Sequence, residues 1–126
     1  MKLERQQRTR SAATALIAIL ALAPVGVVSA ALKVQGKGKD QTLVRDQFAT
    51  DQRARYDMFQ QKCTRCHELA RPISALLNGV TPLSADKFDE EGIKKYVVKM
   101  MRKPNSGIEQ NDAKEIITLL RFARTL

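Results

Sequence analysis

A chain of 126 residues with no Trp and 5% aromatic residues has room for one domain but few large side chains to fill its core. Its 22 Lys and Arg exceed its 13 Asp and Glu, which gives a formal net charge of +9 and favours acidic partners. A nucleic-acid-binding protein is disfavoured, because the basic residues of 87–99 are interleaved with acidic ones and no recognition motif accompanies them.

The first 30 residues have the three-part layout of a secretory signal. Residues 1–10 are polar and basic, residues 12–23 form an apolar run, and small residues surround a cleavage position after Ala30. The alternative is an uncleaved membrane anchor, because residues 11–32 carry no charge and are long enough to span a bilayer. Cleavage is slightly favoured. Both interpretations place the rest of the chain in the periplasm or on the outer face of the cytoplasmic membrane.

A polar segment follows the leader. Residues 31–45 are rich in Gly and charged residues and are predicted to form a linker. The domain itself is expected over residues 46–126. Its first helix is predicted over residues 46–62, because this stretch lacks Pro and Gly and spaces its apolar residues at a helical period.

The remaining elements are predicted from breakers and apolar spacing. Residues 68–87 contain two Pro and an Asn-Gly pair and are expected to be mostly loop, with at most a short turn at residues 73–77. Residues 88–103 form a helix that Pro104 ends, and residues 110–124 form the last helix. No stretch alternates as a strand would, so the sequence predicts an all-α fold.

The motif with the clearest chemistry is Cys63-Thr64-Arg65-Cys66-His67. Two Cys at this spacing on a helical turn point the same way and can bond two vinyl groups of a porphyrin, and the adjacent His can reach the iron. The motif therefore predicts one covalent haem c attached at Cys63 and Cys66, with His67 as the proximal iron ligand.

Three other interpretations of the motif are weaker. A redox dithiol requires a βαβ setting, and the sequence shows no strand. A zinc site requires a fourth ligand, but the chain has only two Cys and one His. A plain disulfide or a chance occurrence is the third. An exported all-α chain with a helix on each side of the motif favours haem over all of these.

The distal iron ligand must be another residue type, because the motif holds the single His of the chain. Met is the usual alternative. Met1 lies in the leader, and Met58 lies on the helix that leads into the proximal side. Met100 and Met101 remain. Met100 is favoured because it shares the apolar face of its helix with Val97, and Met101 is the alternative; both could instead fill the core.

The chain resembles the small class I cytochrome c family over about residues 50–125. In one subgroup a helix that ends in a basic residue and Met runs into a Pro/Gly turn and a C-terminal helix. Similar stretches occur in cytochrome subunits of periplasmic dehydrogenases, such as the haem domains of quinohaemoprotein amine dehydrogenases. The matching stretches here are Tyr56–Lys62, Glu91–Ile93, Lys99–Ile108 and Asp112–Leu120. At the position of Ile93, relatives often have Trp.

The resemblance implies a class I cytochrome c fold, in which about three to four helices surround one haem and the first and last helices cross beside it. Carried over to this chain, it implies attachment at Cys63 and Cys66, a proximal bond from His67, and a distal bond from Met100 or Met101.

The expected function is that of a monohaem cytochrome that carries single electrons between periplasmic or membrane redox partners and is not itself an enzyme. A basic group beside the distal Met either docks an acidic partner or is a solvated helix face. Its members are Lys94, Lys95, Lys99, Arg102 and Lys103. The alternatives are a haem subunit of a larger oxidoreductase complex, or a five-coordinate haem enzyme or gas-binding protein.

Overall fold

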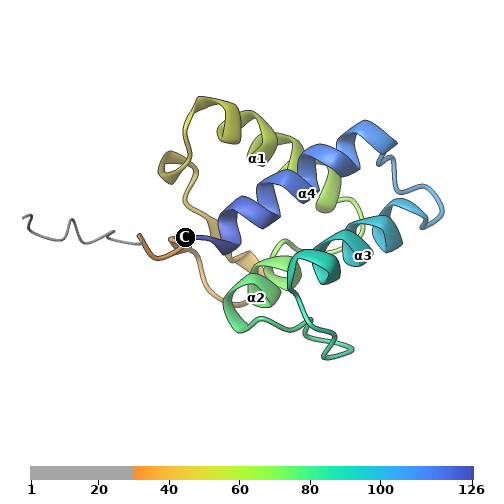
Figure 1. The fold of residues 1–126 in the computed structure, drawn as a ribbon, viewed down its shortest axis with the longest axis horizontal. Helices are drawn as coiled ribbons and strands as arrows, with labels where there is room; N and C mark the ends of the chain where they lie inside the picture. The colour runs from red at the N-terminus through yellow and green to blue at the C-terminus, as the bar shows by residue number, and fades with distance from the viewer. Residues whose placement is uncertain (1–29) are drawn as a thin grey trace, which may run out of the picture.

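The structure is a computed structural model that describes residues 30–126 (Figure 1). All but the last residue of the predicted leader over residues 1–30, and most of the alternative anchor over residues 11–32, therefore lie outside the described residues. Within the described part, no helix has both the length and the apolar character needed to cross a membrane.

The described part of the chain is mostly helical, as the sequence predicts. Its α-helices are α1 (Thr50–Cys63), α2 (Ala70–Asn78), α3 (Glu90–Met101) and α4 (Gln110–Arg124). The C-terminal helix α4 packs against both α1 and α3, and it runs between them across the molecule (Figure 1). The predicted helices over residues 46–62, 88–103 and 110–124 correspond to α1, α3 and α4.

Helix α2 corrects the prediction that residues 68–87 are mostly loop. Pro72 is the third residue of α2, where its missing N–H costs no intrahelical hydrogen bond. Gly79 ends the helix in the left-handed conformation with φ 72°, and its N–H donates to the Ala75 carbonyl. Because Ile73 is also fully buried, the Pro and Asn-Gly signals mark the two ends of a short packed helix.

The expected linker over residues 31–45 is also folded. It contains a small antiparallel hairpin and two 3-10 turns: β1 (Val34–Gln35), η1 (Gly38–Asp40), β2 (Thr42–Leu43) and η2 (Arg45–Gln47). Leu43 is fully buried, and the Tyr56 hydroxyl on α1 donates to the Leu43 carbonyl at 2.8 Å and accepts from the Leu43 N–H at 3.1 Å. This segment is therefore attached to α1 rather than extended away from it.

The helix ends that bear the predicted ligands are set by local chemistry. Helix α3 begins where the Asp89 side chain accepts a hydrogen bond from the Gly92 N–H at 2.8 Å. Gly92 lies so close to the chain before α3 that an added Cβ would be 1.9 Å from the Lys87 carbonyl oxygen. Ile93 and Val97 face the core, as predicted. The last turn of α3, with Met100, therefore lies opposite the segment that follows α1.

Candidate functional site

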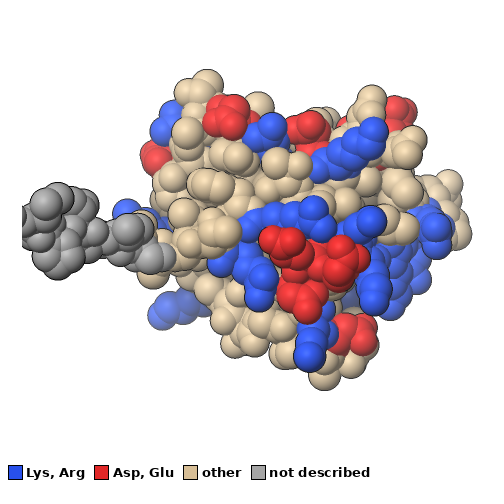
Figure 2. All heavy atoms as spheres, viewed as in Figure 1, with Lys and Arg blue, Asp and Glu red and all other residues tan. Residues whose placement is uncertain are grey.

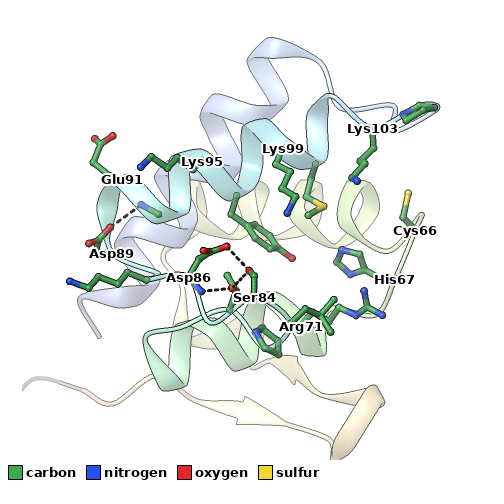
Figure 3. Close-up of a pocket in the computed structure, with 18 residues that line it drawn as sticks. Cys66, His67, Arg71, Ser84, Asp86, Asp89, Glu91, Lys95, Lys99 and Lys103 are labelled. Atoms are coloured by element: carbon green, nitrogen blue, oxygen red, sulfur yellow. Dashed lines mark hydrogen bonds between the residues drawn. The ribbon is translucent and has the colours of Figure 1, made fainter.

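A cavity of about 770 Å³ lies between the Cys-x-x-Cys-His segment, α3 and the loop after α2. Its size falls in the range of small-molecule and cofactor sites, about 300–1,000 Å³. His67 and Arg71 face it from one side, and Lys99 on α3 and Lys103 just after α3 point toward it from the other (Figure 3). A smaller apolar pocket of about 40 Å³ is lined by several of the same residues and extends to Cys63.

The two predicted attachment residues differ in burial. Cys63 is the last residue of α1 and packs against the core, whereas Cys66 is exposed and lines the cavity. Burial first, and then the charge of Cys66, raise the pKa of Cys63 to about 12. Because a reactive dithiol requires a stabilised thiolate, this environment argues against the redox-dithiol interpretation.

His67 has the tautomer of a metal ligand. Its Nδ1 lies 3.0 Å from the Glu68 carbonyl oxygen. A carbonyl can only accept, so Nδ1 is the donor of this hydrogen bond, and in the neutral ring the lone pair is on Nε2. Metal-bound histidines in proteins are oriented by this kind of bond from the other ring nitrogen. The half-buried ring faces the cavity (Figure 3).

The two candidate distal ligands occupy different places. Met100 is among the residues that line the main cavity and also the small apolar pocket, whereas Met101 is among those of neither. Met101 packs against the core, and its carbonyl accepts a hydrogen bond from the Ser106 hydroxyl at 2.8 Å. Met58, on α1, is half-buried and outside both. The structure thus brings Met100, but not Met101, to the same cavity as His67.

A conventional metal cluster is absent from the described residues, since residues 30–126 hold no group of three or more His, Cys, Asp or Glu that could bind an ion. The zinc interpretation therefore finds no further ligands in this part of the chain.

Tyr96 is a cavity residue that sequence reasoning missed. It lies one helical turn before Met100 and lines both the cavity and the pocket. Its ring packs edge-on against Phe88, with ring centroids 5.4 Å apart, and burial raises the pKa of its hydroxyl to about 12. The i, i+4 spacing from Met100 is the signal that could have identified it.

The loop after α2 forms another wall that the sequence did not reveal. Thr81 and Asp86 tie its ends together, because the Thr81 N–H donates to the Asp86 carbonyl at 2.9 Å and the Asp86 N–H donates to the Thr81 hydroxyl at 3.1 Å. Ser84 bridges the two side chains (Figure 3). Leu83, at the cavity edge, is 81% exposed. This loop therefore holds an apolar side chain in solvent at the mouth of the cavity.

Basic side chains gather where α3 ends, on the right of the view in Figure 2. The basic residues along α3 and directly after it are called the α3 basic group, and none of them forms an ion pair within residues 30–126: Lys94, Lys95, Lys99, Arg102 and Lys103. Some basic residues elsewhere do form ion pairs, as Arg45 does with Asp57 at 2.7 Å. Lys95, Lys99 and Lys103 also line the cavity. The cavity is therefore bordered by basic side chains near the end of α3, while Asp86, Asp89 and Glu91 also line it.

Comparisons with protein-family models, with curated proteins and with solved structures return no match for this chain. The function must therefore be argued from the site itself.

Proposed function

We propose that this chain is an exported monohaem c-type cytochrome that carries single electrons. In this proposal haem c is attached at Cys63 and Cys66, and its iron is bound by His67 and Met100 within a class I cytochrome c fold. The observation that carries the proposal is the meeting of an imidazole and a thioether, from segments far apart in the sequence, in one cavity beside the two cysteines.

The residues present fit this group in three respects. The donor set of two thiols, one imidazole and one thioether is that of a His/Met haem c. The cavity has the volume of a cofactor site, and Pro82, Leu83 and Tyr96 give it apolar walls. The Nδ1 proton of His67 is fixed by the Glu68 carbonyl, so Nε2 is available to bind iron.

The chemistry asked of the protein is limited. Each thiol would add across one vinyl group, so that sulfur bonds one carbon and the thiol proton goes to the other. A bound haem iron supplies a one-electron couple, whose potential a Met/His pair raises. Were His67 and Met100 both to bind the iron, no coordination position would be open for a substrate, which would favour electron transfer over catalysis.

The partner in this proposal is an acidic redox protein. Three members of the α3 basic group, Lys95, Lys99 and Lys103, line the cavity, and the positive charge of the whole group would steer an acidic surface toward it. Leu83, which also lines the cavity and is 81% exposed, would supply an apolar contact. A permanent partner within a larger oxidoreductase complex would use the same surface, and co-purification at high salt separates that case from a freely exchanging carrier.

A visible spectrum of the purified full-length protein tests the proposal. We expect the bands of covalently bound haem c, which must survive denaturation and extraction, and a weak near-infrared Met–iron band in the oxidised protein. Met100→Ala should abolish that band, and Met101→Ala, the matched control, should keep it. Loss of the band only in Met101→Ala would overturn the ligand assignment. Ready binding of carbon monoxide by the native protein would instead indicate a five-coordinate enzyme or gas-binding protein.

A further inference from the structure

The segment that follows α3 is fastened to the turn that bears Met100. The Lys103 N–H donates to the Met100 carbonyl at 3.1 Å, and the Ser106 hydroxyl donates to the Met101 carbonyl at 2.8 Å. Ser106 is buried, and its hydroxyl also accepts from the Ile108 N–H at 3.2 Å. The position of Ser106 and the position of the last turn of α3 are therefore coupled.

The next residue, Gly107, is held by the segment that contains the cysteines. Lys62, which directly precedes Cys63, donates from Nζ to the Gly107 carbonyl at 2.9 Å. The same Nζ forms an ion pair with the Asp112 carboxylate at 2.7 Å, and both side chains are mostly buried, at 24% and 16% exposure. Hydrogen bonds from a charged donor are stronger than those between neutral groups, so the partly buried Lys62 ammonium holds both the Gly107 carbonyl and the Asp112 carboxylate firmly.

Arg65 packs on Gly107 from the motif itself. A Cβ at Gly107 would lie 1.7 Å from Nη1 of Arg65, and Gly107 has φ 64°, in the left-handed region that favours glycine. The backbone conformation of Gly107 favours glycine, and the absence of a Cβ lets the Arg65 guanidinium lie directly against it.

We propose that this contact, the Gly107 latch formed by Lys62, Arg65 and Gly107, is a positioning device that keeps Met100 on the iron opposite His67. The inference rests on the proposed function, since it assigns a role to residues around the same site. The Gly107 latch joins the end of α1, which bears Cys63, directly to the segment that follows Met100 and Met101. When these contacts break, the segment after α3 is no longer held against the cysteines, and Met100 leaves the iron more easily.

The fold offers a matched control in the ion pair between Arg55 and Glu115. It also links α1 to α4, with a distance of 2.6 Å and side-chain exposures of 25% and 44%. Arg55 lies two helical turns before the motif and contacts Asp51 and Glu115, not the segment that follows α3. Removing it therefore weakens the same helix pair without touching the latch.

Displacement of the distal ligand by imidazole measures the effect of the latch. Imidazole is titrated into the oxidised haem-loaded protein, and loss of the near-infrared Met–iron band gives the concentration at half displacement. For Lys62→Met, which keeps the alkyl chain, we expect this concentration to fall roughly tenfold, as for loss of a hydrogen bond to a charged group. Lys62→Arg should restore it, and Arg55→Met should change it by less than about twofold.

Equal falls for Lys62→Met and Arg55→Met would overturn the proposal, because the effect would then be general destabilisation. An unchanged value for Lys62→Met would overturn it as well. Should that variant fail to accumulate, Arg65→Ala, whose side chain is exposed, must show a severalfold fall or the proposal is wrong. A wild-type protein without haem or without the band would refute the proposed function before any variant is compared.

Discussion

Tyr56→Phe tests whether residues 31–45 belong to the folded domain. The substitution keeps the buried ring and its packing against Phe48, where the ring centroids are 5.4 Å apart, and removes only the hydroxyl. That hydroxyl donates to the carbonyl of buried Leu43 and accepts from the Leu43 N–H. Apart from the pairing of β1 with β2, the Leu43 N–H and carbonyl have no other hydrogen-bond partner within residues 30–126. The substitution therefore deprives one buried residue of two side-chain partners at once.

The expected loss follows from these contacts. Each hydrogen bond contributes about 1 kcal/mol, and a buried polar group left unpaired costs about 1–3 kcal/mol. We expect the free energy of unfolding to fall by about 2–4 kcal/mol. Guanidinium denaturation followed by circular dichroism measures this loss, and hydrogen exchange at the Leu43 amide should accelerate.

Tyr96→Phe is the matched control for this measurement. It removes a hydroxyl for which no hydrogen bond is recorded within residues 30–126, and we expect a change within about 0.5 kcal/mol. A loss below about 0.5 kcal/mol in Tyr56→Phe would refute the reasoning, because residues 31–45 would then behave as the linker that the sequence predicted.

Three further predictions concern charge and packing. Lys62 and the Glu109 N–H lower the pKa of Asp112 below its ordinary value of 3.8, so its contribution to stability is present above that value and is lost as pH falls through the lowered pKa. Asp112→Asn should therefore lower the free energy of unfolding by about 1–2 kcal/mol at pH 7. Below pH 4 the free energy of unfolding should fall less steeply with decreasing pH in the variant than in the wild type, which denaturation of both proteins at a series of acidic pH values will measure. Gly92→Ala places a Cβ against a backbone carbonyl and should cost well over the roughly 1 kcal/mol expected for Gly79→Ala, where the space is open; comparable thermal denaturation midpoints would contradict this. Lys99→Gln should slow the second-order electron-transfer rate with an acidic partner severalfold at low salt and not at high salt, whereas Lys114→Gln, on α4, should leave the stopped-flow rate unchanged.

The long helices could be predicted because their sequence signals are local. Helix α3 has acidic residues in its first turn after Asp89 and a Pro soon after its end, and its bounds differ from the predicted range of 88–103 by two residues at each end. Helix α4 matches the predicted range of 110–124. In both cases the apolar spacing, the charge placement and the breakers indicate the same element.

The missed elements depend on contacts between distant segments. In α2 the local signals of Pro72 and Gly79 indicate breaks, and only burial of residues such as Ile73 against the rest of the domain favours a helix. The hairpin before α1 is held by Leu43 and Tyr56, which are 13 positions apart. No pattern within a short window contains that pairing.

The candidate site also has features that the sequence shows and features that only the fold determines. The motif and the two adjacent methionines are visible in the sequence, whereas the choice between Met100 and Met101 depends on how α3 is rotated against its neighbours. The cavity wall formed by residues 81–87 depends on where the loop after α2 returns. The sequence spacing identifies the candidate ligand residues, and the tertiary structure determines which of them face the same cavity.

The burial of Cys63 has a consequence for the order of maturation. Burial and the neighbouring Cys66 raise the pKa of this thiol from 9.0 to about 12, so the folded chain holds far less thiolate there than an open chain does. In the proposed cytochrome, bond formation at Cys63 would therefore be faster before folding covers this end of α1. A chain that folded first would attach haem slowly, and the order of folding and attachment would then determine how much protein carries haem.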